Sequence, residues 1–206
     1  MPPTALFDLD GTLVDSAPDL HAAADRMAAR LGLAPYRRDE IVGMIGDGVR
    51  ALVERALAAR GQPFDPAAYQ GFLDDYAAHA AVATRPFRGI PETLDALARG
   101  GWRLAVCTNK PEGAARALLG ALGLLDRFAA IGGGDTFPVR KPDPEHLVAT
   151  LRAAGGAPAH AVMIGDHRND IEAAAGAGIP CVFAAWGYGP AGTAQGAAAV
   201  ARTPAE

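Results

Sequence analysis

Short apolar runs alternate with helical segments through the second half of the chain, and this alternation limits the folds open to the sequence. Strands are expected over residues 102–107, 128–131, 161–164 and 180–184. Helices are expected around them, over residues 92–99, 111–122, 144–154 and 169–175. Strands separated by helices of this length form βαβ units with a parallel sheet. With a further strand expected at residues 5–9, the pattern predicts an α/β fold.

The segment between the first strand and residue 85 carries helical signals instead. Three helices are expected there, over residues 17–31, 49–59 and 66–82. A helical block inserted into the first crossover would lie over the carboxyl ends of the strands, where a lid belongs. We therefore divide the chain into a catalytic core, residues 1–15 and 85–206, and an all-helical cap, residues 16–84.

Composition narrows the range of partners. The chain has 206 residues and a net charge of −4, without a basic stretch to suit nucleic acid. No apolar run approaches the ~20 residues that span a membrane. No secretory signal is recognised, and Cys107 and Cys181 are expected to be buried free thiols, so we expect a cytoplasmic protein. Composition does not decide between a monomer and a homodimer.

Two acidic residues, Asp8 and Asp10, lie at the end of the first predicted strand and just beyond it. Strand alternation points both to the same side. Gly11 then permits a sharp turn, and Thr12 adds a hydroxyl. Two carboxylates this close repel each other unless a cation or a proton intervenes. An ordinary Asp-Gly turn is the alternative, and the pair alone does not decide between the two.

Polar residues also follow two later strands. Thr108 and Asn109 stand at a strand-to-helix junction, where a hydroxyl and backbone amides suit a phosphate oxygen. Asp166 follows its strand directly, and Asp170 lies one helical turn further on, so their oxygens can face one magnesium ion. Helix capping is the alternative for all four, because Thr, Asn and Asp are favoured at helix starts.

Lysine is rare in this chain. Of 19 basic residues only Lys110 and Lys141 are lysine, and each precedes a proline. An ammonium is a compact point charge, unlike the planar fork of arginine. Lys141 is therefore a candidate to offset charge on a transferring phosphoryl group, with a solvated loop lysine as the alternative.

The order of these groups along the chain favours a single site. Parallel strands bring their carboxyl ends to one edge of the sheet. A carboxylate nucleophile, a second carboxylic acid, a cation and a phosphate cradle together make a phosphoryl-transfer site.

These motifs resemble those of the haloacid dehalogenase superfamily of phosphatases. The resemblance runs through Asp8-Leu9-Asp10-Gly11-Thr12, Thr108-Asn109-Lys110, Lys141-Pro142 and Gly165-Asp166…Asp170. It implies a Rossmann-like parallel sheet core with an inserted helical cap. Within the superfamily the chain is most similar to the phosphoglycolate phosphatase group. His167 departs from the pattern, because the family usually has a small hydroxyl residue at this position.

The resemblance also implies roles for the acids. Asp8 would attack phosphorus, and Asp10 would protonate the leaving alcohol and later take a proton from water. Magnesium would be held by Asp8, by the backbone carbonyl of Asp10 and by Asp166. Asp170 would steady a neighbouring lysine or a metal-bound water.

The remaining implied roles concern the substrate, a small phosphorylated metabolite. Thr108, the amide of Asn109 and Lys141 would hold the phosphoryl oxygens. The implied reaction is magnesium-dependent hydrolysis of a small phosphate monoester, with 2-phosphoglycolate favoured. In the cap, Arg50 lies in the first turn of a predicted helix and could hold a substrate carboxylate, although an exposed surface arginine is the alternative.

Other functions stay open at this point. A phosphatase for another sugar phosphate, for a nucleotide or for pyrophosphate would keep the same site, as would a phosphoglucomutase-like phosphotransferase. A signalling receiver domain also pairs acids with a hydroxyl and a lysine, but the inserted cap and the acid two residues after Asp8 argue against it. A dehalogenase would need neither Asp10 nor magnesium. Because no group needed for catalysis is missing, a non-catalytic binding protein is the weakest alternative.

Overall fold

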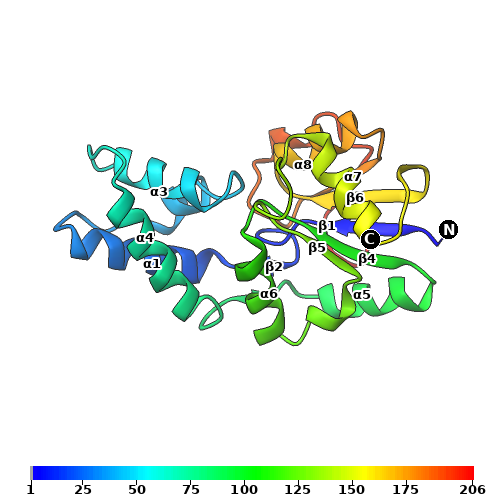
Figure 1. Cartoon of the computed structure of the whole chain (residues 1–206), viewed down its shortest axis with the longest axis horizontal. Coiled ribbons are helices and arrows are strands. Elements are labelled where there is room, and N and C mark those ends of the chain that lie inside the picture. The colour runs from blue at the N-terminus through cyan, green and yellow to red at the C-terminus, as the bar shows by residue number, and fades with distance from the viewer. Residues whose placement is uncertain (1) are drawn as a thin grey trace.

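A parallel sheet forms the core of one of the two parts of the computed structural model, which describes residues 2–206 (Figure 1). Within the described residues, the six strands of this sheet stand in the order β5 (Ala130–Gly132), β4 (Arg103–Cys107), β1 (Thr4–Phe7), β6 (Ala161–Gly165), β7 (Cys181–Ala184) and β8 (Ala199–Ala201). Every neighbouring pair runs parallel. The α/β fold with a parallel sheet is therefore confirmed.

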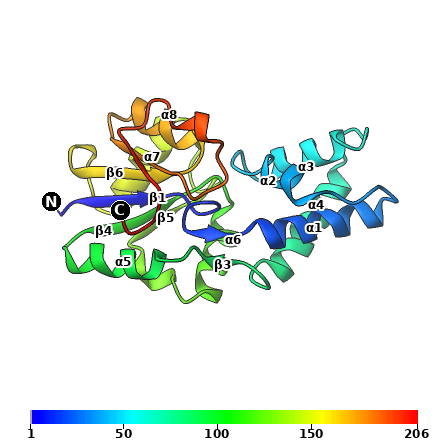
Figure 2. The same ribbon diagram turned by 180° about the vertical axis from the view of Figure 1, so that it is seen from behind.

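Helices cover both faces of this sheet. They are α5 (Ile90–Arg99) and α6 (Glu112–Ala121) on one face, and α7 (Pro144–Ala153) and α8 (Arg168–Gly176) on the other (Figures 1 and 2). Alternate residues of β1 enter the two layers: Phe7 packs with Leu94 and Leu118, whereas Leu6 packs with Leu147. A central parallel strand is buried on both faces, which is why β1 is apolar at successive positions.

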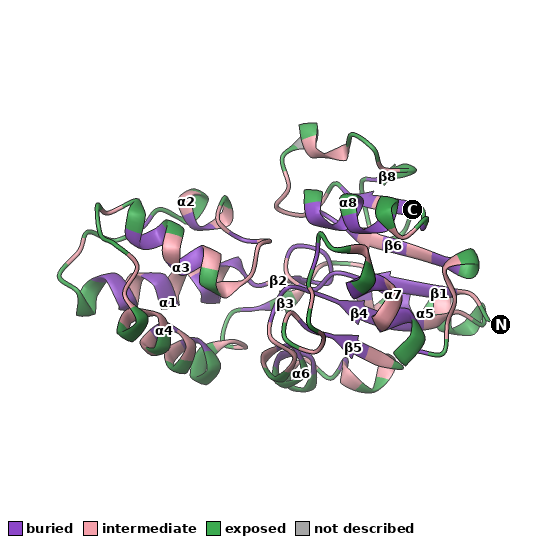
Figure 3. Cartoon of the chain, turned by 45° about the horizontal axis from the view of Figure 1, so that its top comes forward, coloured by how far each residue is buried: buried purple, intermediate pink, exposed green. Residues whose placement is uncertain are grey.

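The inserted segment folds into helices with a core of their own. Within the described residues these are α1 (Ala17–Arg30), α2 (Arg38–Val42), α3 (Val49–Ala58) and α4 (Pro66–His79). Met27, Leu57 and Phe72 are almost completely buried in this separate cluster. Figure 3 shows buried faces turned toward each other within this group, apart from the sheet. The separate core supports our proposal that residues 16–84 form a cap domain.

A two-stranded ribbon that the sequence did not predict connects the two parts. It pairs β2 (Val14–Asp15) with β3 (Arg85–Pro86) in antiparallel fashion. Beside the ribbon, both carboxylate oxygens of Asp19 accept from the amide of Ala83 at 3.0 Å, and one also accepts from the hydroxyl of Thr84 at 2.7 Å. These bonds fasten the start of α1 to the end of the insertion.

The C-terminal tail, for which no element was predicted, supplies β8 at the edge of the sheet. Residues 2–206 also contain three short 3₁₀ turns, at Leu125–Arg127, Pro158–His160 and Ala191–Ala194. The two cysteines are buried free thiols, as predicted. Among the described residues no helix is both long and apolar enough to cross a membrane.

Candidate active site

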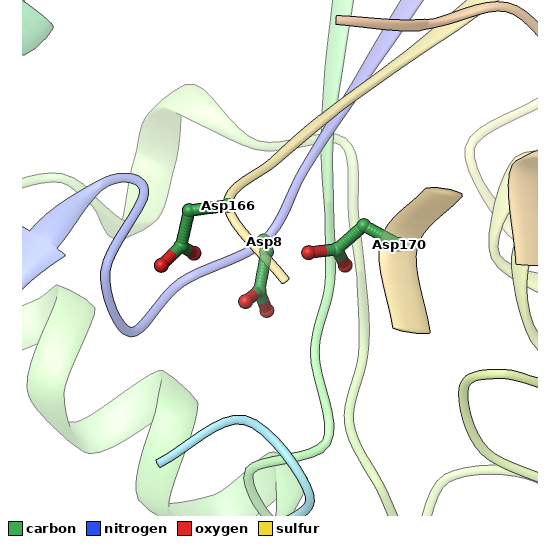
Figure 4. A group of neighbouring side chains, drawn as sticks. All are labelled: Asp8, Asp166 and Asp170. Atoms are coloured by element: carbon green, nitrogen blue, oxygen red, sulfur yellow. The ribbon is translucent and has the colours of Figure 1, made fainter. Parts of the chain in front are cut away.

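Three buried carboxylates meet at the carboxyl edge of the sheet. Asp8 follows β1, Asp166 follows β6, and Asp170 lies in the first turn of α8. One carboxylate oxygen from each lies within 4.8 Å of the others, and Figure 4 shows Asp8 between the other two. The strand register explains the meeting, because Phe7 pairs with Ile164, which leaves the ends of β1 and β6 level.

The cluster is electrostatically costly in the absence of a cation. Burial, together with the carboxylates of Asp8 and Asp170, raises the pKa of Asp166 to about 7. The hydroxyl of Thr12 and the amide of Tyr188 donate to Asp166 at 2.9 and 2.7 Å, and these bonds oppose the rise. Three buried acids that converge and repel one another in this way favour a bound divalent cation.

Two structural details fit that cation. Asp8 Oδ1 is buried and makes no hydrogen bond within the described chain. Gly11, at φ +90°, leaves room for the acids, since a Cβ there would lie 2.4 Å from Asp166 Oδ2. The donor set is hard carboxylate oxygen, which suits magnesium.

Lys141 supplies positive charge within the cluster. Its ammonium lies 2.9 Å from Asp8 Oδ1, an ion-pair distance without hydrogen-bond alignment, and it donates to Asp170 at 2.6 Å. Burial would lower the pKa of Lys141, but Asp170 and Asp8 raise it above its ordinary value. The lysine is therefore charged at neutral pH.

Sequence reasoning missed the residue that holds the Lys141 loop. The amide of Lys141 donates to Nδ1 of His146 at 3.1 Å, and Nε2 of His146 lies 3.0 Å from the carbonyl of Gly133. Burial lowers the pKa of His146 to about 4, so its ring is neutral. The sequence alone did not indicate this role, although His146 lies only five residues after Lys141.

Thr108 and Asn109 lie where the sequence predicts, at the end of β4. The hydroxyl of Thr108 is buried and accepts from the amide of Lys110 at 3.2 Å. The side-chain amide of Asn109 donates to the carbonyls of Lys141 and Gly46, at 3.0 and 3.1 Å. Asn109 therefore ties the lysine loop to the cap, a contact that the sequence did not reveal.

Lys110 is a second site residue whose role the sequence left unassigned. Its ammonium donates to both carboxylate oxygens of Asp10, at 3.0 and 2.9 Å, and to the hydroxyl of Tyr76 in α4 at 3.0 Å. Burial would lower the pKa of Lys110, but Asp10 and Tyr76 raise it. The scarcity of lysine in the chain was a signal for both site lysines.

A cavity of about 220 Å³ lies between the cap and this edge of the sheet. Asp8, Asp10 and Thr108 line its core side. Its cap side is mostly apolar, with Leu20, Ile45, Val49, Leu52, Leu73 and Tyr76 among the lining residues. A cavity of this size suits a small ligand better than a drug-sized one.

The structure does not bring Arg50 to the cavity. Its guanidinium donates to Glu54 at 2.9 Å and lies over the ring of Phe64, 4.6 Å from the centroid. The side chain is 59% exposed and is not part of the cavity wall. As positioned here, Arg50 is a surface arginine, because its charge points to Glu54 and solvent. Its assignment to a substrate carboxylate finds no support in this geometry.

His167 lies at the contact between core and cap. Gly46 has φ +118°, and a Cβ there would lie 2.4 Å from the His167 ring, so a larger residue would need a strained backbone and a shift of that ring. Beside it, Asn169 donates to Asp47 of the cap loop at 2.6 Å. His167 therefore packs against the cap in this structure.

Comparison with known proteins places these features in a family. The family model described as haloacid dehalogenase-like hydrolase matches residues 2–178. A phosphoglycolate phosphatase of Agrobacterium fabrum is 45% identical over 190 residues, covering 90% of this chain and 82% of that enzyme. A phosphoglycolate phosphatase of Caulobacter vibrioides is 46% identical over 189 residues, covering 90% of this chain and 80% of that enzyme.

Solved structures agree with this grouping. The crystal structure of a predicted phosphoglycolate phosphatase from Haemophilus somnus superposes with a TM-score of 0.89 at 29% identity, covering 98% of this chain and 95% of that one. CbbY from Rhodobacter sphaeroides, solved in complex with phosphate, gives a TM-score of 0.86 at 26% identity, covering 100% of this chain and 96% of that one.

Proposed function

Since the chain belongs to the haloacid dehalogenase-like hydrolases, we propose that its buried acidic site hydrolyses 2-phosphoglycolate with the help of magnesium and through an aspartyl-phosphate. The observation that carries the chemistry is Asp8, which lines the cavity and lies 2.9 Å from Lys141. The substrate follows from relatives 45% and 46% identical, both phosphoglycolate phosphatases. The protein is a phosphoric monoester hydrolase.

Asp8 is the proposed nucleophile. Its carboxylate oxygen attacks phosphorus, the phosphorus–ester oxygen bond breaks, and glycolate leaves. Because the attacking group and the phosphoryl group are both anionic, positive charge must be close to both. Lys141 provides it, and Asp170 holds the ammonium in place through a 2.6 Å bond.

Asp10 is the proposed acid and base. It gives a proton to the leaving oxygen in the first step. In the second step it takes a proton from water, whose oxygen attacks phosphorus while the bond to Asp8 breaks. Inorganic phosphate then leaves, and both carboxyl groups return to their starting forms.

Magnesium is the proposed cofactor. Asp8, Asp166 and the backbone carbonyl of Asp10 would hold it. When bound, the ion offsets repulsion between the acids and an anionic phosphoryl group. The convergence of Asp8, Asp166 and Asp170 within 4.8 Å supports this proposal.

Thr108, the amide of Asn109 and Lys141 are the proposed cradle for the phosphoryl oxygens. Thr108 lines the same cavity as Asp8, and its hydroxyl keeps its own proton free to donate, because in its one described bond it accepts. The cap closes the cavity on the other side and would exclude water during the reaction. We propose a cytoplasmic enzyme, in keeping with its two buried free thiols.

A panel of phosphate monoesters, together with the phosphoanhydride pyrophosphate, tests this proposal. The purified protein would be assayed for release of inorganic phosphate from 2-phosphoglycolate, glucose 6-phosphate, a nucleoside monophosphate and pyrophosphate, each with magnesium and with a chelator. We expect the highest kcat/KM for 2-phosphoglycolate, and loss of activity with the chelator. A higher kcat/KM for another compound would reject the substrate but keep the phosphatase.

A further inference from the structure

Lys110 is a cation in the cavity wall that the hydrolysis described above does not use. Its side chain is 5% exposed, and it stands beside Asp10 rather than beside the acids around Asp8. Among the lining residues of the described chain, Lys110 is the one cationic side chain. Lys141, the other lysine, is already engaged by Asp8 and Asp170. A buried ammonium is costly without an anion, and within the described chain the anion that contacts Lys110 is Asp10.

Tyr76, a residue of the cap, contacts the ammonium of Lys110. Its hydroxyl oxygen accepts from Lys110 at 3.0 Å, and its ring lies 4.7 Å from the same ammonium. Burial raises the pKa of Tyr76, so the hydroxyl keeps its proton. No acceptor for that proton is found in the described chain, and Tyr76 also lines the cavity. The hydroxyl therefore has a donor to offer a ligand.

The substrate of the proposed function, 2-phosphoglycolate, carries a carboxylate that would lie near Lys110 and Tyr76. Its carboxylate carbon is two bonds from the ester oxygen, which Asp10 would protonate. A substrate placed for that proton transfer sets its carboxylate beside Asp10. Lys110 is the direct neighbour of Asp10, at 2.9 Å.

We propose that Lys110 and the Tyr76 hydroxyl bind the substrate carboxylate and thereby select substrates that carry one. This proposal rests on the proposed function. Lys110 gives up one of the two hydrogen bonds that it now donates to Asp10, and Tyr76 donates its free proton. Selection for an acidic leaving group thus comes from a core lysine and a cap tyrosine, not from Arg50. Because Tyr76 belongs to the cap, the substrate carboxylate also bridges cap and core.

The test compares two substrates that differ only in this group. 2-Phosphoglycolate carries the carboxylate, and 2-hydroxyethyl phosphate replaces it with a neutral alcohol. The readout is the ratio of their kcat/KM values in wild type, Lys110→Met, Lys110→Arg and Tyr76→Phe. Because each variant is compared with itself, a general loss of activity cancels in the ratio.

We expect wild type to prefer 2-phosphoglycolate at least about tenfold, and Lys110→Met to lower this ratio by about 10- to 100-fold, the range for a charge-assisted hydrogen bond. Lys110→Arg should keep part of the preference, and Tyr76→Phe should lower it severalfold. Arg116→Met removes an exposed cation of α6 that pairs with Glu112 outside the cavity, and it should keep the wild-type ratio.

Two results would overturn the proposal, and they are distinguishable. A wild-type ratio near one means that 2-phosphoglycolate is not the preferred substrate, so the proposed function fails with it. A wild-type preference that survives in Lys110→Met means that the function holds and the carboxylate is bound elsewhere. Circular dichroism shows whether Lys110→Met folds. If it does not, Tyr76→Phe is the test, because this variant keeps the aromatic ring and loses only the hydroxyl. A wild-type ratio of kcat/KM values in Tyr76→Phe would then reject the proposal.

Discussion

The ammonium of Lys141 lies 2.9 Å from the carboxylate of Asp8, and both side chains are more than nine-tenths buried. This pair brings the proposed nucleophile next to a fixed positive charge before any substrate arrives. The loop that carries Lys141 is held by His146 and Asn109 through its amide and its carbonyl. The position of the charge is therefore set by the fold as well as by the ion pair.

Replacing Lys141 with methionine should reduce both stability and activity. The variant leaves Asp8 and Asp170 buried without their cation, and breaking a buried pair in this way costs about 3–5 kcal/mol. We expect a fall in the free energy of unfolding of that order in urea, and a loss of at least about 100-fold in kcat. Arg152→Met, at an exposed cation of α7, is the control. An unchanged kcat would contradict a role on the phosphoryl group.

Replacing Asp8 with asparagine should abolish turnover while the fold persists. An amide of the same shape cannot form the acyl phosphate, so we expect a loss of at least about 1000-fold in kcat, as for other covalent nucleophiles. Rapid quenching with labelled substrate should trap a phosphoprotein in wild type and none in the variant. Asp74→Asn, at an exposed acid of α4, is the matched control. A variant that keeps a tenth of the activity would reject Asp8 as nucleophile.

Much of the fold was predictable because apolar runs and helix signals are local. Strand β1, which ends at Phe7, and strand β6, which ends at Gly165, were both expected from their sequence. The shared edge of a parallel sheet then brings Asp8 and Asp166 together without further information. The tail at β8 was not predictable, since a run such as Ala199–Ala201 has no strand signal of its own.

Contacts between the cap and the core could not be predicted from local sequence patterns. Tyr76 reads as an ordinary core aromatic of α4, and only the folded arrangement shows that its hydroxyl meets Lys110 from 34 residues away. The direction of the Arg50 side chain could not be predicted for the same reason. A position in the first turn of α3 does not say which way the side chain points, and Glu54 one turn later engages it.

Acidification should test the neutral ring of His146. Its pKa is about 4 in the fold, below the ordinary value of 6.5, because the ring is buried. The unfolded chain binds a proton near pH 6.5 and the folded chain does not, so stability is lost as the pH falls from 6.5 to 4. Over this pH range the free energy of unfolding of the wild-type protein should fall by up to about 3 kcal/mol more than that of His146→Gln.

Urea denaturation at several pH values measures this difference. The gap in unfolding free energy between wild type and His146→Gln should be widest above pH 6.5 and should narrow toward pH 4. His160→Gln, at an exposed histidine, controls for the general effect of losing one titratable ring. A gap that stays constant with pH would mean that the folded protein and the unfolded chain bind the His146 proton equally, and would contradict a lowered pKa in the fold.

Removing Asp166 should weaken the response of the protein to magnesium. Asp166 is buried beside Asp8 and Asp170, and a divalent cation bound among them lowers their mutual repulsion. Because the unfolded chain has no such site, binding stabilises the folded state. Magnesium at 100 times its dissociation constant stabilises by about 2.7 kcal/mol. For a chain of this length we therefore expect Tm to rise by about 5–10 °C after chelator-treated protein is given magnesium.

In Asp166→Asn the same magnesium concentration should give a much smaller rise, because one anionic ligand and part of the repulsion are both gone. The metal-free variant should itself melt at or above the wild-type temperature, since asparagine carries no charge into the cluster. Asp126→Asn, at an exposed acid, should respond to magnesium as wild type does. An equal rise in Asp166→Asn and wild type would show that the ion binds elsewhere, and the converging carboxylates would then need another explanation.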